Sequence, residues 1–460
     1  MKQPYFAALR RRSLATIGLL VSLCMLGLSG CDSGSDSDSD DTEERSLRLV
    51  NAVVGSTYIG WEINESDQGT VYFGRASTAQ ALINGDKPLT FYLVQADGDY
   101  EYLDLAFDYE LYGDQDVLIV LYGTLDDISY EIIEVDTFDE DEDLGQVGFL
   151  NLTSAYDAVD LYLTDDEDGI YGASPTVSSQ VGVFSGMEYV DEGDYALRFT
   201  ETGDKTEIFD AGDVEIDEDS NHFYLMMDFY SGSDELLVLE IVSDDTSRQL
   251  VSDDSTGQLR FFNAIADYVS VDVYLGSTSG EPLFMGQGFQ SITDFAELEP
   301  DTYSLNITPE GVLDTFLFEG EVDVVAGSYT TLVVAGSVLN DDIGGNAIAD
   351  IVQPVTSGAL VSFVHASTSN DDVDVYLLLP GQPTTDTVPI VSDLSPFLSY
   401  DFVEDEGEFQ IVLIQSSNDA VVLGPVPVSF EAGSIYEIFF TDTEGGGTPG
   451  AITVVETASE

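Results

Sequence analysis

A segment of six residues that occurs four times along the chain constrains this fold more than any other feature. The copies occupy residues 47–52, 147–152, 259–264 and 361–366, and each is a mainly apolar segment with a polar residue at its fifth position and a small or apolar residue at its sixth. The polar marker is Asn51, Asn151, Asn263 or His365, and these positions are 100, 112 and 102 residues apart. Repetition at such a period indicates four copies of one structural unit.

In three of the four repeats, a second motif follows the marker. The segments 159–163, 271–275 and 373–377 alternate three apolar residues with an Asp and a Tyr, and the Asp lies nine residues after the marker. The first repeat keeps the apolar alternation at 59–63 but has Gly60 and Glu62 in place of the Asp and the Tyr. The first repeat is therefore the divergent one.

Each repeat consists of short apolar alternations separated by turn residues, and no 3.6-residue period is sustained. This pattern predicts an antiparallel β-sandwich of about seven strands. Polar stretches at 139–143, 244–256 and 353–358 separate the repeats. The expected domains are a signal peptide at 1–30, an acidic tether at 31–46, and sandwiches at 47–138, 146–243, 257–353 and 359–457.

The N-terminus has the features of an export signal. Lys2 and arginines at 10–12 precede an apolar run at 14–28, which is shorter than the roughly 20 residues of a membrane-spanning helix. Residues 28–31, Leu-Ser-Gly-Cys, resemble a bacterial lipobox, which implies that Cys31 is acylated and anchors the mature chain. The alternative is an ordinary signal peptide that contains a cysteine. Cys24 lies in the segment to be removed, so we expect no disulfide.

The charge of the chain restricts its partners. Four of the 12 Lys and Arg lie in the signal and none of the 88 Asp and Glu do, so the mature net charge is 8 − 88 = −80. Such a surface repels phosphate, which argues against nucleic acid and anionic lipid headgroups as direct ligands. The acidity suits either solubility in a salty medium or a dedicated role in cation binding. Residues 32–44 contain nothing to bury and predict a solvated tether.

The repeated openings and the Val-Asp-Val-Tyr motif at 271–274 resemble the bacterial family known as domain of unknown function 4397. The resemblance extends from residue 47 to about residue 457 and is weakest in the first repeat, at Gly60 and Glu62. It implies an all-β chain of four tandem immunoglobulin-like antiparallel β-sandwich domains in an exported envelope protein. The family carries no established activity, so the resemblance implies no catalytic residue.

Few side chains are available for nucleophilic or metal chemistry. The one cysteine of the mature chain, Cys31, is expected to be acylated. His365 occupies a marker position that is Asn in the other repeats, which indicates a shared structural hydrogen bond. His222 has no His or Cys neighbour in the sequence to complete a zinc site. Lys87 and Lys205 are the only lysines of the mature chain, and neither lies in a phosphate-binding loop. We therefore expect no enzyme activity and no cofactor.

Two acidic loops are candidates for calcium, which prefers oxygen ligands. One contains Asp165, Asp166 and Asp168, and the other contains Asp341 and Asp342. Neither loop has the spacing of an EF-hand, and a solvated acidic loop is the alternative interpretation of both.

The recurring Asp and Tyr side chains form a candidate recognition surface. Each pair is two residues apart on a strand, so both side chains are expected on one sheet face, about 7 Å apart. The pairs are Asp160 and Tyr162, Asp272 and Tyr274, and Asp374 and Tyr376. Either the Tyr stacks on a ligand, or it covers the sheet while the Asp accepts a hydrogen bond from a neighbouring hydroxyl or turn amide.

The sequence as a whole predicts a non-enzymatic, lipid-anchored protein of the bacterial cell envelope, facing the periplasm or the cell surface. Its tandem domains are expected to act as a binding, adhesion or spacer module, with an envelope glycan or protein as the ligand. The alternative is a carbohydrate-active protein that uses paired carboxylates, since Asp and Glu are the abundant reactive groups.

Overall fold

The computed structural model describes residues 45–458, except 57, 83–84, 95–99, 112–114, 137–142, 166–168, 230–234, 244–245, 253–254, 354, 356–357 and 448. The predicted signal peptide, Cys31 and residues 32–44 of the tether lie outside the described residues. The described residues contain β-strands, two short 3₁₀ helices and no α-helix, so the all-β prediction is confirmed. Within this part of the chain, no helix has the length and apolar character needed to cross a membrane.

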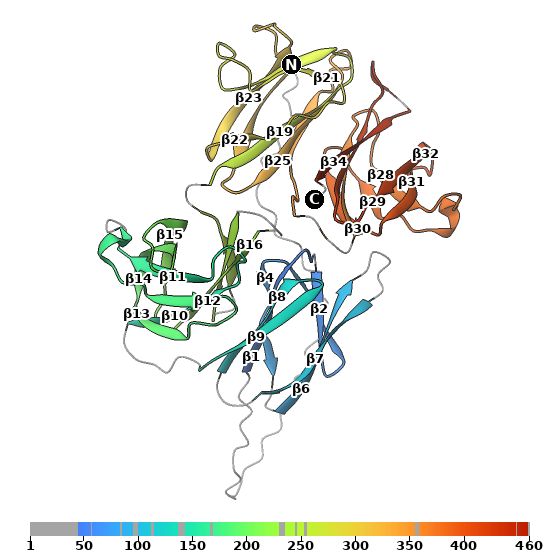
Figure 1. The fold of residues 1–460 in the computed structure, drawn as a ribbon. Coiled ribbons are helices and arrows are strands. Elements are labelled where there is room, and N and C mark those ends of the chain that lie inside the picture. Colours follow the sequence, from blue (N-terminus) through green and yellow to red (C-terminus); the bar gives the residue numbers. More distant parts are fainter. Residues whose placement is uncertain are drawn as a thin grey trace, which may run out of the picture. The chain divides into compact units, whose positions relative to one another are not determined.

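The strands form eight sheets, which combine in pairs into four modules numbered along the chain (Figure 1). Module 1 contains β1 (Arg45–Val54), β2 (Tyr58–Ile63), β3 (Ser66–Tyr72), β4 (Arg75–Ala76), β5 (Gln80–Leu82), β6 (Gly85–Val94), β7 (Tyr100–Leu111), β8 (Gln115–Thr124) and β9 (Asp127–Asp136). Module 2 contains β10 (Leu144–Asn151), β11 (Ala158–Thr164), η1 (Ile170–Gly172), β12 (Val177–Gln180), β13 (Met187–Asp191), β14 (Gly193–Glu201), β15 (Glu207–Ile216), β16 (Asn221–Asp228), β17 (Leu236–Val242) and β18 (Ser247–Leu250).

Among the described residues, the last two modules have eight strands each. Module 3 contains β19 (Gly257–Ile265), β20 (Ser270–Leu275), β21 (Phe284–Gly288), β22 (Ala296–Leu298), β23 (Asp301–Pro309), β24 (Phe318–Val324), β25 (Tyr329–Gly336) and β26 (Gly344–Ala349). Module 4 contains β27 (Ala359–Ala366), β28 (Val373–Leu378), η2 (Thr384–Asp386), β29 (Val391–Leu394), β30 (Ser399–Glu404), β31 (Gly407–Gln415), β32 (Val421–Phe430), β33 (Ile435–Thr441) and β34 (Ala451–Ala458).

The four modules share one topology. In the first sheet of each module the opening strand lies beside a late strand, in the orders β4-β1-β8-β9, β13-β10-β16-β17-β18, β22-β19-β25-β26 and β30-β27-β33-β34. This central pair is parallel in every module, although the other pairs are antiparallel. The second sheets have the orders β3-β2-β6-β7, β12-β11-β14-β15, β21-β20-β23-β24 and β29-β28-β31-β32. The apolar alternation predicted an antiparallel sandwich and carried no information on the parallel pair.

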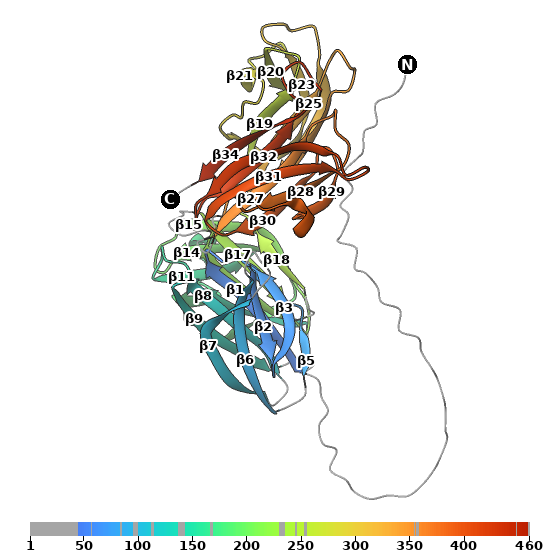
Figure 2. The same cartoon turned by 90° about the vertical axis from the view of Figure 1, so that its right-hand side faces the viewer.

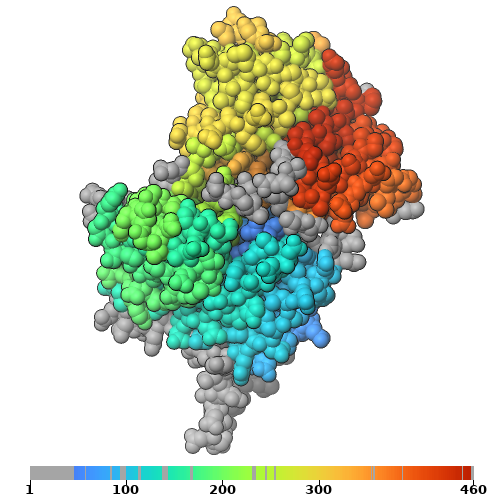
Figure 3. Space-filling view, viewed as in Figure 1, coloured from blue at the N-terminus to red at the C-terminus, as the bar shows by residue number. Residues whose placement is uncertain are grey.

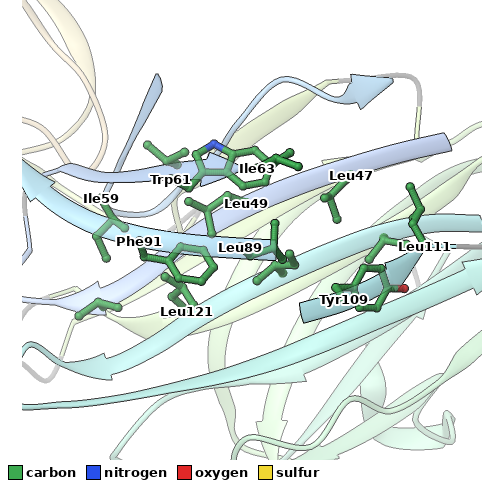
Figure 4. Close-up of a cluster of buried hydrophobic side chains, with 14 residues drawn as sticks. Leu47, Leu49, Ile59, Trp61, Ile63, Leu89, Phe91, Tyr109, Leu111 and Leu121 are labelled. Atoms are coloured by element: carbon green, nitrogen blue, oxygen red, sulfur yellow. The ribbon is translucent and has the colours of Figure 1, made fainter. Parts of the chain in front are cut away.

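Apolar side chains from both sheets fill the space between them. In module 1, Leu49 of the opening strand meets Trp61 of β2 and Phe91 of β6, and all three are fully buried (Figure 4). Successive residues of a strand point to opposite faces, so Leu49, Trp61 and Phe91 lie on the inner faces and their neighbours in sequence on the outer faces. Equivalent inner clusters fill modules 2, 3 and 4.

The first sheets of neighbouring modules also bury their outer faces against each other. Val120 of module 1 and Leu225 of module 2 belong to one buried apolar cluster. In the second pair, Phe262 of module 3 stacks on Phe439 of module 4 with ring centroids 3.8 Å apart and an interplanar angle of 10°. The coloured atoms of modules 1 and 2, and those of modules 3 and 4, meet in Figure 3. The modules therefore form two pairs, each with a shared core.

Two strands extend beyond the domain limits expected from polar composition. β1 begins at Arg45, inside the expected tether, because residues 45–47 pair with β5. β18 lies between 244 and 256, where we expected a linker, because it pairs with β17 and its Leu250 packs into the inner core of module 2. Polar composition did not indicate either extension.

Candidate functional site

The Asp of the repeated motif holds strands together in all three modules that have it. Asp160 accepts hydrogen bonds from Ser178 Oγ at 2.6 Å and Thr202 Oγ1 at 2.9 Å. Ser178 lies on β12, which pairs with β11 on one side, and Thr202 directly follows β14, which pairs with β11 on the other side. The carboxylate therefore joins the two flanking strands, which is the structural alternative considered for this residue.

Asp272 and Asp374 repeat this arrangement with other donors. Asp272 accepts hydrogen bonds from the backbone N–H groups of Gly286 at 2.7 Å and Gly311 at 2.8 Å. Asp374 accepts from the N–H of Asp393 at 2.9 Å and from Ser416 Oγ at 2.7 Å. Each Asp thus satisfies donors on both sides of its strand, and losing it would leave those donors without a partner.

The Tyr of the motif is packed and does not form an exposed recognition surface. Tyr162 and Tyr274 are 1% and 3% exposed, so their faces are closed to a stacking ligand, and this part of the predicted surface is wrong. Lys205 Nζ covers Tyr162 at 4.1 Å from the ring centroid and also donates to its hydroxyl. Tyr376 is half-buried and packs against an apolar cluster that includes Val412. The alternation correctly separated the two faces of the strand but could not show what covers the outer one.

Tyr274→Ser is expected to lower the free energy of unfolding by about 2 kcal/mol, because it removes a buried ring from the outer face of β20. Urea unfolding of the full chain measures this loss. Tyr171→Ser is the control, since Tyr171 is 87% exposed and should be close to neutral. Unchanged stability of the Tyr274 variant would contradict the packed role.

The four marker side chains make equivalent hydrogen bonds, as the sequence predicted. In the first three modules the Oδ1 of Asn51, Asn151 or Asn263 accepts the backbone N–H two residues later, at 3.0–3.1 Å. In module 4 the Nδ1 of His365 accepts the N–H of Ser367 at 3.3 Å. The side-chain amide nitrogen of each marker Asn also donates to a backbone carbonyl. In module 4, His365 Nε2 lies 3.1 Å from the backbone carbonyl of Asp371. The histidine therefore replaces the amide as a neutral ring with its proton on Nε2.

His365→Asn is expected to be nearly neutral at pH 7 and to make the chain more resistant to acid. Burial lowers the pKa of His365, while Asp371, Asp372 and Asp442 oppose this shift. A folded pKa below the unfolded value of about 6.5 contributes stability above that pH, and this stability is lost as the pH falls through the folded pKa. Urea unfolding at pH 7 and pH 5 tests both statements. A cost well above about 1 kcal/mol at pH 7 would show that His365 has a role that Asn cannot fill.

In the second predicted calcium loop, one carboxylate has a structural partner. Asp342 accepts the N–H of Ser337 at 2.7 Å and so closes the turn between β25 and β26. Asp166 and Asp168 lie outside the described residues, and the expectation for their loop stays a prediction. Across the described parts of 45–458, no three His, Cys, Asp or Glu side chains come together as metal ligands.

A groove of about 410 Å³ opens between the two sheets of module 2. His222 lies at its floor, with Nε2 2.8 Å from Ser220 Oγ and Nδ1 3.4 Å from Glu240 Oε1. Tyr224 donates to the same Glu240 oxygen at 2.8 Å, and Arg248 Nε donates to the other. Sequence reasoning missed Glu240, although a charged residue in the apolar strand 236–242 was a usable signal.

The floor of this groove is a hydrogen-bonded network that keeps Glu240 ionised. Burial raises the pKa of Glu240, but hydrogen bonds from His222, Arg248 and Tyr224 outweigh burial and hold the pKa below its usual value. Ser220 is itself buried and donates to the carbonyl of Asp217 at 2.6 Å. Glu240 therefore has no proton to transfer near neutral pH, and the network connects β15–β18 instead of presenting an acid to a substrate.

A second buried charged cluster joins modules 3 and 4. Arg260 Nε donates to Thr331 Oγ1 at 2.8 Å, and the guanidinium forms ion pairs with Asp350 at 3.6 Å and with Glu437 of module 4. Burial raises the pKa of Glu437 to about 9, with a further increase from Asp350 and an opposing effect of Arg260. Two carboxylates thus share one buried cation, which favours protonation of Glu437.

An arginine at the same repeat position marks the first module of each pair. Arg48 of module 1 corresponds to Arg260 of module 3, and its Nη1 donates to the carbonyl of Val242 in module 2 at 3.0 Å. The even-numbered repeats have Gly148 and Ser362 at this position. This alternation between odd and even repeats was visible in the sequence and could have predicted the pairing.

Comparison with known proteins identifies a family for part of the chain. Residues 257–376 match the model described as Domain of unknown function (DUF4397), which here covers module 3 and the first two strands of module 4. The predicted resemblance is thereby confirmed for this region. Among solved structures, the Bacillus anthracis TIE protein aligns with this chain at 6% sequence identity, and the alignment covers 89% of this chain and 75% of the TIE chain. The TM-score of this alignment is 0.16, which supports no structural argument. No curated protein matches the chain.

Proposed function

We propose that this chain is a non-enzymatic, lipid-anchored protein of the bacterial cell envelope whose modules act as a rigid binding or spacer scaffold. The anchor is Cys31, at the end of the predicted lipobox, and the acidic segment 32–44 separates it from the first module. The main support for the proposal is that the two modules of each pair share an apolar core.

The shared cores favour a scaffold because they hold neighbouring modules in one arrangement. Leu118 and Val120 of module 1 and Phe223 and Leu225 of module 2 are all buried in one cluster. Burial of apolar surface of this kind is the main stabilising contribution in stable association. A pair joined in this way presents its remaining outer faces in a constant geometry, which suits a binding module on a membrane anchor.

The carbohydrate-active alternative has less support. A glycosidase needs a carboxylic acid that is protonated near neutral pH, opposite a second carboxylate. Glu240 lies at the floor of the groove in module 2, but three donors keep it ionised. Glu437 has a raised pKa, but it is buried between two modules and is engaged with Arg260.

Cys31→Ser is expected to abolish membrane association, because it removes the thiol that would carry the lipid. Cells that express the full chain are labelled with a radioactive fatty acid and separated into membrane and soluble fractions. Label is expected in the membrane-bound protein and not in the variant, with Cys24→Ser as the matched control. Label retained by the Cys31 variant would refute the anchor.

A further inference from the structure

The second sheet of module 1 carries an outer face on which two tyrosine rings, Tyr100 and Tyr102, are exposed. Ile59, Trp61 and Ile63 of β2 point into the core, so Gly60 and Glu62 lie on the outer face. These two residues replace the Asp and Tyr of the repeated motif. The four strands of this sheet, β3-β2-β6-β7, lie side by side in Figure 2.

Gly60 allows a tyrosine ring to lie directly on the sheet. Tyr92 of β6 is the cross-strand partner of Gly60, and a Cβ at residue 60 would come within 2.1 Å of its ring. The ring of Tyr100 stacks on Tyr92 at a centroid distance of 4.2 Å and an angle of 20°. Tyr102, the cross-strand partner of Tyr92 on β7, lies at 5.9 Å. Tyr100 and Tyr102 remain 47% and 54% exposed, so this layer of rings faces solvent.

Two carboxylates are held beside the rings. Tyr102 donates its hydroxyl to Glu62 Oε1 at 2.9 Å, and Thr90 Oγ1 donates to Oε2 at 3.0 Å. The Tyr92 hydroxyl donates to Asp67 Oδ1 at 2.7 Å. This hydrogen bond and one from the Gly69 N–H lower the pKa of Asp67, so its carboxylate is charged at neutral pH. The face therefore combines exposed ring surfaces with fixed negative charge.

The surrounding sheet carries no exposed positive charge. Strands β2, β3, β6 and β7 contain seven Asp and Glu residues and one basic residue, Lys87. Lys87 is only 6% exposed, so its ammonium group does not neutralise the carboxylates on the outer face. Aromatic faces attract cations through the ring quadrupole, and carboxylates beside them add a direct charge interaction.

We propose that this outer face, formed by Gly60, Glu62, Asp67, Tyr92, Tyr100 and Tyr102, binds a polypeptide segment that carries arginine or lysine side chains. The cation would lie on the exposed rings of Tyr100 and Tyr102, within reach of Glu62 and Asp67. A neutral sugar would stack on the same rings and donate hydroxyl hydrogen bonds to the carboxylates, but it would leave their negative charge uncompensated, whereas a cationic side chain compensates it. This proposal rests on the proposed function as a binding scaffold, and it names the class of ligand that the scaffold binds.

The test uses the full chain and a capped hexa-arginine peptide in isothermal titration calorimetry. About 0.5 M NaCl is present to screen the general acidity of the surface. The double variant Tyr100→Ser, Tyr102→Ser is expected to bind at least about fivefold more weakly, because it removes both rings without changing the charge. Glu62→Gln is expected to weaken binding as well, and a hexa-citrulline peptide, which is neutral, is expected not to bind.

The matched control is the double variant Tyr171→Ser, Tyr189→Ser, which removes two exposed tyrosines of module 2 and should leave affinity unchanged. Thermal unfolding establishes that every variant is folded. Equal affinity of the wild type and the Tyr100, Tyr102 variant would overturn the proposal. So would binding of hexa-citrulline or of a neutral cello-oligosaccharide that depends on these rings. Because fatty-acid labelling of Cys31 is independent of this face, failure of the anchor and failure of the binding site are distinguishable.

Discussion

Phe439→Ala is expected to lower the free energy of unfolding by about 3–5 kcal/mol, the usual cost of removing a fully buried phenylalanine. The Phe439 ring stacks on Phe262 at 3.8 Å, and both belong to the apolar core that modules 3 and 4 share. Because that core joins two modules, the substitution is also expected to separate their unfolding into two transitions. Urea unfolding of the full chain, followed by tyrosine fluorescence and circular dichroism, measures both effects.

The control for this substitution is Phe316→Ala, since Phe316 of module 3 is 44% exposed and should contribute little. A loss below about 1 kcal/mol for Phe439→Ala would be typical of a surface position and would contradict a shared core. A single transition of unchanged steepness would contradict the coupling of the two modules through this contact.

Glu437→Gln is expected to stabilise the chain by a few kcal/mol at pH 8 and to have little effect near pH 4. The folded pKa of Glu437, about 9, lies above the ordinary value of 4.5. The stability associated with a raised pKa is fully present below the unfolded value and is lost as the pH rises through the folded one. The wild type therefore loses stability between about pH 4.5 and pH 9, by up to about 1.4 kcal/mol per pH unit. A glutamine cannot ionise and avoids the loss.

Urea unfolding at pH 5, 7 and 8.5 provides the measurement for this second prediction. Glu319→Gln is the matched control, because Glu319 is an exposed residue of β24 in module 3. A stability difference between Glu437→Gln and the wild type that does not grow with pH would show that Glu437 is ionised in the folded chain. In that case the ion pair with Arg260 would outweigh its burial.

The cluster around Arg260 and the network around Glu240 illustrate opposite outcomes for a buried carboxylate. Glu240 has three donors to itself, and its pKa is lowered. Glu437 shares one guanidinium with Asp350, and its pKa is raised. Both side chains are almost fully buried, so burial alone does not decide the charge state, and the number of donors for each carboxylate does.

Local sequence patterns were sufficient for the fold class and for the structural role of the markers. The two-residue alternation around Trp61 and Val273 places apolar side chains between two sheets, because successive residues of a strand point to opposite faces. Four equivalent positions with an amide or imidazole predicted one shared hydrogen bond, since a side chain that recurs at one place in a repeat meets the same backbone groups. These conclusions need only neighbours that are close in sequence or in the repeat.

Long-range packing decided which of the outward-facing residues remain exposed. Lys205, which is far from Tyr162 in sequence, folds over that ring and removes it from the surface. The partner module covers the outer face at Phe262 and Leu225. In module 1 the absence of a Cβ at Gly60 lets Tyr92 lie flat, so the repeat with the most divergent motif has the exposed aromatic face. Alternation along a strand determines the side to which a residue points, but the segments that cover that side come from distant parts of the chain, and only tertiary packing brings them together.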